Sequence, residues 1–117
     1  MSGALVVLVT APGAARARAL ARALVEERLA ACGNVVPGLA SIYRWKGKLH
    51  DDAEALLILK TTRARFAALR ERILALHPYQ VPEVLALPVE AGGGRYLAWL
   101  RAETAPVRRR APRRPRR

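Results

Sequence analysis

A single thiol and an imidazole beside a proline are the side chains of this sequence best suited to bind a metal ion. Cys32 is the one cysteine, and a thiolate is a ligand that soft metal ions favour. His77 directly precedes Pro78, and its imidazole can bind a transition metal or cap the end of a helix. We therefore take His77 and Cys32 as candidate metal ligands, with a helix cap and a buried structural thiol as their alternatives.

A second group of candidates combines aromatic side chains with a carboxylate. Tyr79 lies between two prolines and is followed by Glu83, which could be a carboxylate ligand or base, or accept backbone hydrogen bonds in a rigid loop. Tyr43 and Trp45 are two residues apart, so on a strand they share one face. They could stack on a base or ring, but aromatic residues favour subunit interfaces, where we expect both to lie. Trp45, Tyr79 and Glu83 are our candidates for lining a ligand cleft.

The sequence lacks the short motifs of common enzymes. It contains no G-x-S-x-G, H-E-x-x-H or C-x-x-C, so hydrolase, zinc-protease and dithiol chemistries have no local support. The glycines at 92–94 lack the Lys-Ser/Thr pair of a phosphate-binding loop. We therefore expect a protein that is not an enzyme.

Length and composition fit one globular domain with a basic tail. The chain has 117 residues, 52% of them hydrophobic, which is enough to build a core. Seven of the 21 basic residues lie in 108–117, where there is no acid, so the net charge of +12 is mostly a property of the tail. We expect a folded domain over 1–105 and a disordered Arg/Pro-rich tail over 106–117.

Nothing in the sequence indicates a membrane segment or a secretion signal. No apolar run reaches the roughly 18 residues that span a bilayer. No basic region precedes the apolar residues 4–10, so they read as a first strand and not as a signal peptide. One cysteine cannot form a disulfide within the chain, which fits a reducing compartment. We expect a cytoplasmic protein.

Apolar periodicity and turn residues predict strands, two main helices and a short terminal helix. Residues 4–10 are continuously apolar, and 14–31 have the alanine, leucine and arginine content of a helix. Proline and glycine at 37–38 should bulge or bend the second strand. The expected elements are a strand at 4–10, a helix at 14–31, strands at 35–48 and 53–61 joined through a polar turn region at 47–52, a helix between Thr62 and Pro78, a strand at 84–89 and a short helix at 96–102.

This order predicts an α+β, ferredoxin-like βαββαβ fold, with a four-stranded antiparallel sheet and both main helices on one face. The strand at 53–61 offers four consecutive apolar residues, Leu56 to Leu59, so both of its faces are apolar. A sheet that is apolar on both faces needs cover on both. Because the sequence leaves no third layer, other copies of the chain should supply the cover, and we expect a homo-oligomer.

Six strings at consistent spacing resemble the divalent-cation tolerance family known as CutA. They are TAP at 10–12, ERLAAC at 27–32, VPGLASIYRWKGKL at 36–49, LILKTT at 57–62, HPYQVPE at 77–83 and YLAWL at 96–100. The resemblance implies a compact homotrimer of ferredoxin-like subunits, with extended strands joining neighbouring sheets. It also implies a non-enzymatic role in the response to metal ions, with copper or another divalent cation as the ligand.

The resemblance extends only in part to the copper ligands of some bacterial members. Val9 stands where those proteins have a cysteine at the end of the first strand, and Leu76 where they have the first of two histidines. His77 matches the second histidine. Cys32 matches the cysteine of the family's Cys-x-Asn string and remains a second candidate ligand.

Two other functions remain open at this point. A trimeric sensor like the PII signalling proteins would bind an anion or a nucleotide, and Arg44, Lys46 and Lys60 could serve its phosphates. The arginine tail could bind nucleic acid through phosphates. The strands at 4–10 and 53–61 carry no aromatic residue for stacking on RNA bases, so we expect at most nonspecific binding through the tail.

Overall fold

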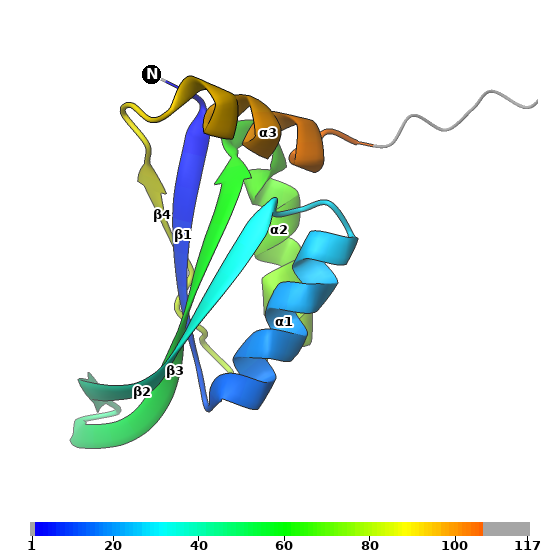
Figure 1. Ribbon diagram of the computed structural model, residues 1–117. Helices are drawn as coiled ribbons and strands as arrows, with labels where there is room; N and C mark the ends of the chain where they lie inside the picture. The colour runs from blue at the N-terminus through cyan, green and yellow to red at the C-terminus, as the bar shows by residue number, and fades with distance from the viewer. Residues whose placement is uncertain (1, 107–117) are drawn as a thin grey trace, which may run out of the picture.

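The computed structural model describes residues 2–106, which form one antiparallel sheet and three helices (Figure 1). The strand order is β2-β3-β1-β4, which confirms the ferredoxin-like arrangement expected from the sequence. The elements are β1 (Ala4–Ala11), α1 (Ala14–Glu26), β2 (Cys32–Trp45), β3 (Lys48–Thr62), α2 (Arg63–Leu76), β4 (Leu85–Pro88) and α3 (Gly94–Thr104).

The core lies between the sheet and helices α1 and α2, which cover the same face (Figure 1). Strand side chains alternate between the two faces, so every second residue of β1 and β3 enters this core. Val7 and Leu57 are fully buried there, and they pack in one cluster with Leu24 of α1 and with Leu69 and Ile73 of α2. The apolar spacing that predicted the two helices thus places their buried sides on the sheet.

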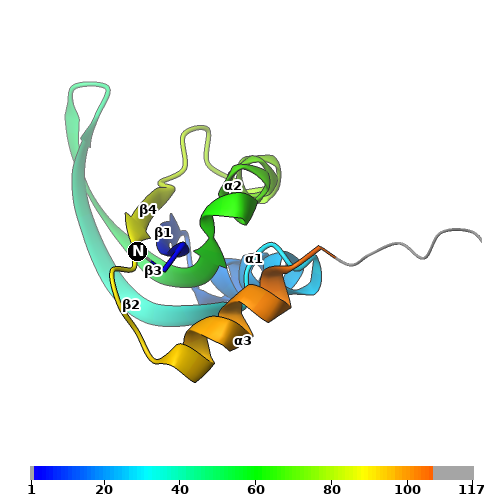
Figure 2. The same ribbon diagram turned by 90° about the horizontal axis from the view of Figure 1, so that it is seen from above.

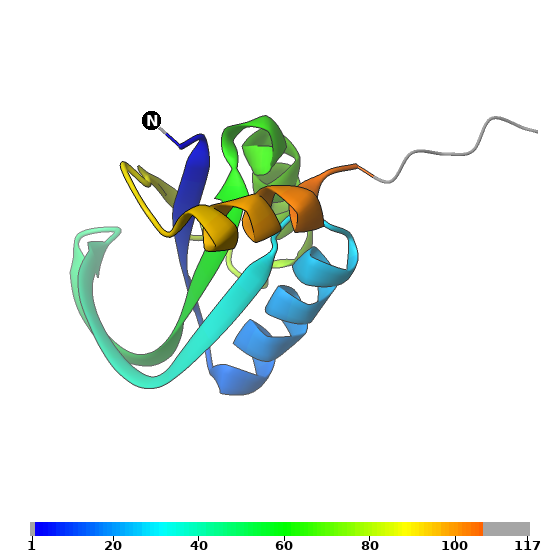
Figure 3. The same ribbon diagram turned by 45° about the horizontal axis from the view of Figure 1, so that its top comes forward.

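The second face of the sheet is also apolar, and α3 covers only one end of it. Ala4 lies on the opposite face from Val7 yet is buried, because Leu100 of α3 packs against it and against Ala31. Figure 3 shows α3 crossing this end of the sheet. Farther along the same face, Leu8 and Ile58 keep part of their surface exposed. The expected apolar second face is therefore present, with partial cover from the chain itself.

Beyond an irregularity in their pairing, residues 39–54 of β2 and β3 extend past the body as a curved hairpin, which we call the arm (Figure 2). This irregularity lies between Val36 and Leu39, where Gly38 has a φ of 75°, so the bulge expected at Pro37-Gly38 is confirmed. The prediction of a polar turn region at 47–52 is wrong, because most of these residues belong to β3.

The arm ends in a two-residue turn, which explains why the polar region is strand. Lys46 and Gly47 both have positive φ, 50° and 78°, as a tight turn of the primed type requires. Trp45 and Lys48 pair directly across it. The polar side chains that follow stand on a strand open to water, where antiparallel sheets tolerate them.

The helix expected at 14–31 ends early, at a C-terminal motif that lacks the usual glycine. Arg28 takes the left-handed conformation, with φ of 59°. Its amide donates to the carbonyl of Val25 at 3.0 Å, and the amide of Leu29 donates to that of Leu24 at 2.9 Å. These two bonds form a Schellman motif, in which glycine normally takes the position of Arg28. Because arginine replaces that glycine, the end of α1 cannot be recognised from residue types.

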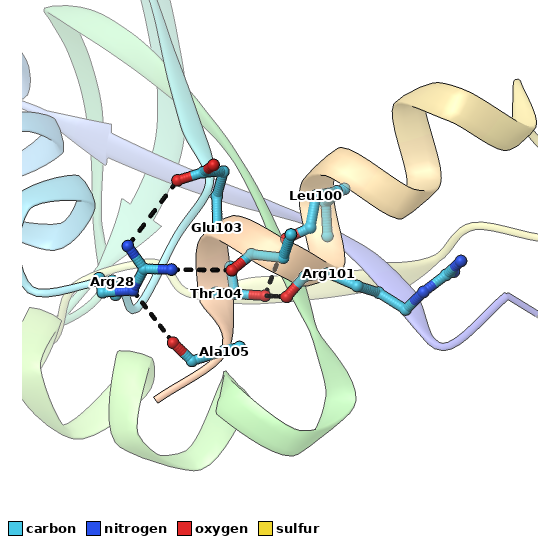
Figure 4. Close-up of polar contacts among 7 residues, drawn as sticks. Arg28, Leu100, Arg101, Glu103, Thr104 and Ala105 are labelled. Carbon is cyan, nitrogen blue, oxygen red and sulfur yellow. Dashed lines mark hydrogen bonds and ion pairs between the residues drawn. The ribbon is translucent and has the colours of Figure 1, made fainter. Parts of the chain in front are cut away.

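The side chain of Arg28 then ties this corner to the end of α3 (Figure 4). Its Nη2 donates to the carbonyl of Ala102 at 2.8 Å, and its Nε donates to that of Ala105 at 3.0 Å. Glu103 lies 3.8 Å from Nη1. A cation bonded to the last carbonyls of a helix compensates its dipole, so one arginine links α1 to α3.

The expected tail falls almost wholly outside the described residues, since 107–117 are not among them. None of the helices within residues 2–106 is long and apolar enough to cross a membrane.

Candidate functional site

A cleft of about 660 Å³ lies between the arm and the loop that joins α2 to β4. The arm contributes Tyr43 and Trp45 to its wall, and the loop contributes Tyr79 and Glu83. The four aromatic and acidic residues that we predicted to line a cleft or an interface therefore all line this cleft. Glu54 of β3 lines it as well, and the sequence analysis missed this residue.

Glu54 is a buried carboxylate held by a tyrosine. Only 8% of its surface is exposed, and the hydroxyl of Tyr79 donates a hydrogen bond of 2.7 Å to its Oε2. Burial, and next this bond to Glu54, raise the pKa of Tyr79 well above its ordinary value. The phenol therefore stays protonated at neutral pH and serves as a donor.

Glu83 is the second carboxylate of the cleft. Much of Glu83 is exposed, but its partial desolvation raises the pKa of its carboxyl above the ordinary value, and the negative charge of Glu54 raises it further. Among residues 2–106, no lysine or arginine lines the cleft to offset the two acids. Arg44, Lys46 and Lys60, which a bound phosphate would need, are absent from its walls.

Tyr43 is fixed within the arm by two contacts. Its hydroxyl donates to the carboxylate of Asp52, and its ring stacks on that of His50 with 5.1 Å between the centroids. The hydrogen bond to Asp52 is the main reason why the pKa of Tyr43 is raised. These contacts hold one aromatic wall of the cleft in place.

His77 is buried just beside the cleft, and both of its ring nitrogens are in use. The backbone amide of Tyr79 donates to Nδ1 at 3.1 Å, so Nδ1 carries no proton. The proton therefore lies on Nε2, which donates to the carbonyl oxygen of Thr10 at 2.8 Å. This neutral imidazole ties the end of α2 to the end of β1, and a metal ion could bind it only by displacing one of these partners.

Cys32 lies elsewhere, at the start of β2. The residue is half-buried, and its sulfur lies 3.7 Å from Oδ1 of Asn34 and 4.0 Å from Nζ of Lys60. Cys32 pairs with Lys60, whereas Thr10, the partner of His77, pairs with Leu56 nearer the arm. The structure thus does not bring the two candidate metal ligands together. Within residues 2–106 no three His, Cys, Asp or Glu side chains are grouped to hold a metal ion.

One sequence signal could have located Glu54. It is the last acid before the apolar run of β3, at a point in the strand where an acid is costly to bury. Such a residue is retained when something pairs with it, but the pairing with Tyr79, 25 residues away, is visible only in the fold.

Comparison with known proteins places these features in a family. The family model described as CutA1 divalent ion tolerance protein matches residues 5–103. The divalent-cation tolerance protein CutA of Thermus thermophilus is 59% identical over 99 residues, covering 85% of this chain and 96% of that protein. The chloroplastic protein CutA of Arabidopsis thaliana is 47% identical over 100 residues, covering 86% of this chain but 55% of that protein. The chain thus spans about half the length of some relatives.

Solved structures agree with the sequence comparisons. The Cut A1 structure from Thermus thermophilus superposes with a TM-score of 0.85 at 57% identity, covering 87% of this chain and 99% of that one. The periplasmic divalent cation tolerance protein CutA from Archaeoglobus fulgidus gives a TM-score of 0.84 at 33% identity, covering 87% and 99%. Because both sequence and fold match over most of its length, the chain belongs to the CutA1 divalent ion tolerance family.

Proposed function

We propose that this protein acts in tolerance to divalent cations, as a non-enzymatic homotrimer in the cytoplasm. The observation that carries the proposal is the family match over residues 5–103, together with 59% identity to a relative named for divalent-cation tolerance. Copper is the cation we test first, because a thiol and an imidazole are ligands it favours.

His77 and Cys32 remain the proposed metal ligands, each acting at its own place. Since they lie apart, each would need further ligands from solvent, from a rearranged loop or from another copy of the chain. Cys32 is the more accessible of the two, because the residue is half-buried where His77 is buried, and its sulfur makes only long contacts. His77 would have to give up Tyr79 or Thr10.

The proposal is tested by copper titration and by growth. Calorimetry should give copper binding in the micromolar range for the full chain, and Cys32→Ser and His77→Ala should each abolish the binding at their own site, which lowers the number of copper ions bound. His50→Ala removes the other histidine of the sequence and is the matched control. A strain that lacks the gene should grow less well in excess copper. Absence of both binding and a growth defect would exclude this function.

Exposed apolar side chains support the trimer. Ile42 and Leu49 of the arm are 68% and 71% exposed, and Leu85 and Leu87 of β4 are at least half exposed. Apolar surface of this extent favours contact with other copies, as does the pair of aromatic residues Tyr43 and Trp45 that we assign to the interface.

Sedimentation equilibrium tests the oligomeric state directly. The full chain should have three times the monomer mass, and Ile42→Asp should shift it toward monomer because a charge is costly in an apolar interface. Leu74→Asp changes an exposed residue of α2 in the helix layer and should leave the mass unchanged. A wild-type protein that stays monomeric at micromolar concentration would contradict the trimer.

Cell fractionation tests the cytoplasmic location, since one structural relative is named periplasmic.

A further inference from the structure

The cleft between the arm and the loop has the walls of a site for an organic cation. Two carboxylates, Glu54 and Glu83, line it, and the aromatic rings of Tyr43, Trp45 and Tyr79 form its sides. Its volume of about 660 Å³ is that of a site for a small molecule or a large side chain. No basic side chain of the part of the chain that the structure describes lines it.

Glu54 lacks the partner that a buried carboxylate requires. It is 92% buried, and the hydrogen bond that the structure gives it comes from the neutral hydroxyl of Tyr79. Within residues 2–106, neither Glu54 nor Glu83 forms an ion pair. A buried acid without a cation costs free energy, which a bound cation would recover.

The aromatic walls favour a cation that is flat. Rings of Trp and Tyr attract a cation placed over their faces, and a planar guanidinium can also stack on them. Lys46, which is not among the residues that line the cleft, places its ammonium 6.0 Å from the centre of the Trp45 ring, at the outer limit of such a contact. A guanidinium also presents parallel N–H donors that match the two oxygens of a carboxylate.

We propose that this cleft is a guanidinium-binding site, in which Glu54 and Glu83 accept the N–H donors and Trp45 and Tyr79 enclose the flat cation. The proposal goes beyond the role in divalent-cation tolerance and does not depend on it, because it uses neither Cys32 nor His77. The raised pKa of Glu83 agrees with it, since a cation bound beside Glu83 would offset the charge of Glu54 and favour the ionised carboxylate.

Two sources could supply the guanidinium. One is a free small molecule that carries this group. The other is an arginine side chain of another copy of this protein, whose sequence holds seven arginines in 108–117. Both sources share the same chemistry at the cleft, and an experiment can separate them.

Calorimetry at neutral pH with the full chain tests the site, using methylguanidinium as the probe and methylurea as its neutral, planar counterpart. Methylguanidinium should bind at millimolar concentration or below, and methylurea should give no binding in the same range. Glu83→Gln should weaken binding at least tenfold. Glu90→Gln removes an exposed carboxylate that does not line the cleft and should bind like the wild type.

A deletion of residues 107–117 identifies the source. If arginines of another copy occupy the cleft, the shortened chain should bind methylguanidinium several-fold more tightly; an unchanged affinity assigns the cleft to a free ligand. Trp45→Leu, checked for folding by circular dichroism, should weaken binding several-fold. Equal binding of methylurea and methylguanidinium, no binding of either, or wild-type affinity in Glu83→Gln would overturn the proposal.

Discussion

Gly33 of β2 and Ala21 of α1 lie so close that a Cβ on residue 33 would stand 2.9 Å from the Cβ of Ala21. The same Cβ would stand 3.2 Å from Cδ2 of Leu59. The φ of Gly33 lies outside the left-handed region, so this glycine is required by the close approach of helix and strand and not by its conformation.

Gly33→Ala should therefore destabilise the fold by overpacking. We expect a loss of about 1–3 kcal/mol in the free energy of unfolding, measured by urea denaturation. Adding Ala21→Gly should recover part of the loss, although glycine within a helix itself costs about 1 kcal/mol. Gly13→Ala, where no atom lies within 4 Å of the added Cβ, is the control. Equal losses at positions 13 and 33 would contradict the argument.

Arg28 allows a test that separates backbone strain from side-chain contacts. Arg28→Ala keeps the left-handed strain and loses the bonds to the carbonyls of Ala102 and Ala105, so we expect a loss of about 1–2 kcal/mol. Arg28→Gly loses the same bonds but relieves the strain, and should be more stable than the alanine variant by about 1 kcal/mol. Urea denaturation measures both.

Hydrogen exchange then shows where the effect of Arg28 is felt. The amides of the last turn of α3 should exchange faster in both variants, because that turn loses its cap. An alanine variant as stable as the glycine variant would mean that the conformation of residue 28 carries no strain.

The fold could be predicted from the sequence where apolar spacing decides it. Residues such as Leu57 and Leu69 follow the strand and helix periods, and Pro37-Gly38 marks the bulge in β2. Prediction failed where the local signal was missing. The end of α1 uses arginine in place of glycine, and the arm is strand through a polar stretch whose pairing is set by the turn at Lys46-Gly47.

The site could be predicted in part. Trp45, Tyr79 and Glu83 were grouped by residue type, and the fold brings them to one cleft. Glu54 was missed because its partner Tyr79 is distant in sequence. Likewise, the residues around His77 in the sequence do not indicate that both of its ring nitrogens form hydrogen bonds with backbone groups. Thr10 comes close to His77 only because α2 packs on the sheet.

His77→Ala should destabilise the protein even without metal. The substitution leaves the carbonyl of Thr10 and the amide of Tyr79 without their partner in a part-buried place, which should cost about 1–3 kcal/mol. Urea denaturation in the presence of a chelator measures the loss, and faster hydrogen exchange at the Tyr79 amide locates it. His50→Ala, which loses only a ring stack in the arm, should cost less. If the two variants lose equal stability, the bridge between α2 and β1 is not what His77 provides.

Glu83 should make the stability of the protein depend on pH. Its pKa in the folded state is raised above the ordinary value of 4.5, so the unfolded chain loses this proton first as the pH rises. The unfolded state then binds fewer protons than the folded one. The free energy of unfolding therefore falls as the pH rises from the ordinary pKa through the raised pKa. In Glu83→Gln this part of the fall should be absent, whereas Glu90→Gln should keep it. Urea denaturation at a series of pH values from 4 to 7 measures the three slopes, and a wild-type slope in Glu83→Gln would show that the carboxylate is not disfavoured in the cleft.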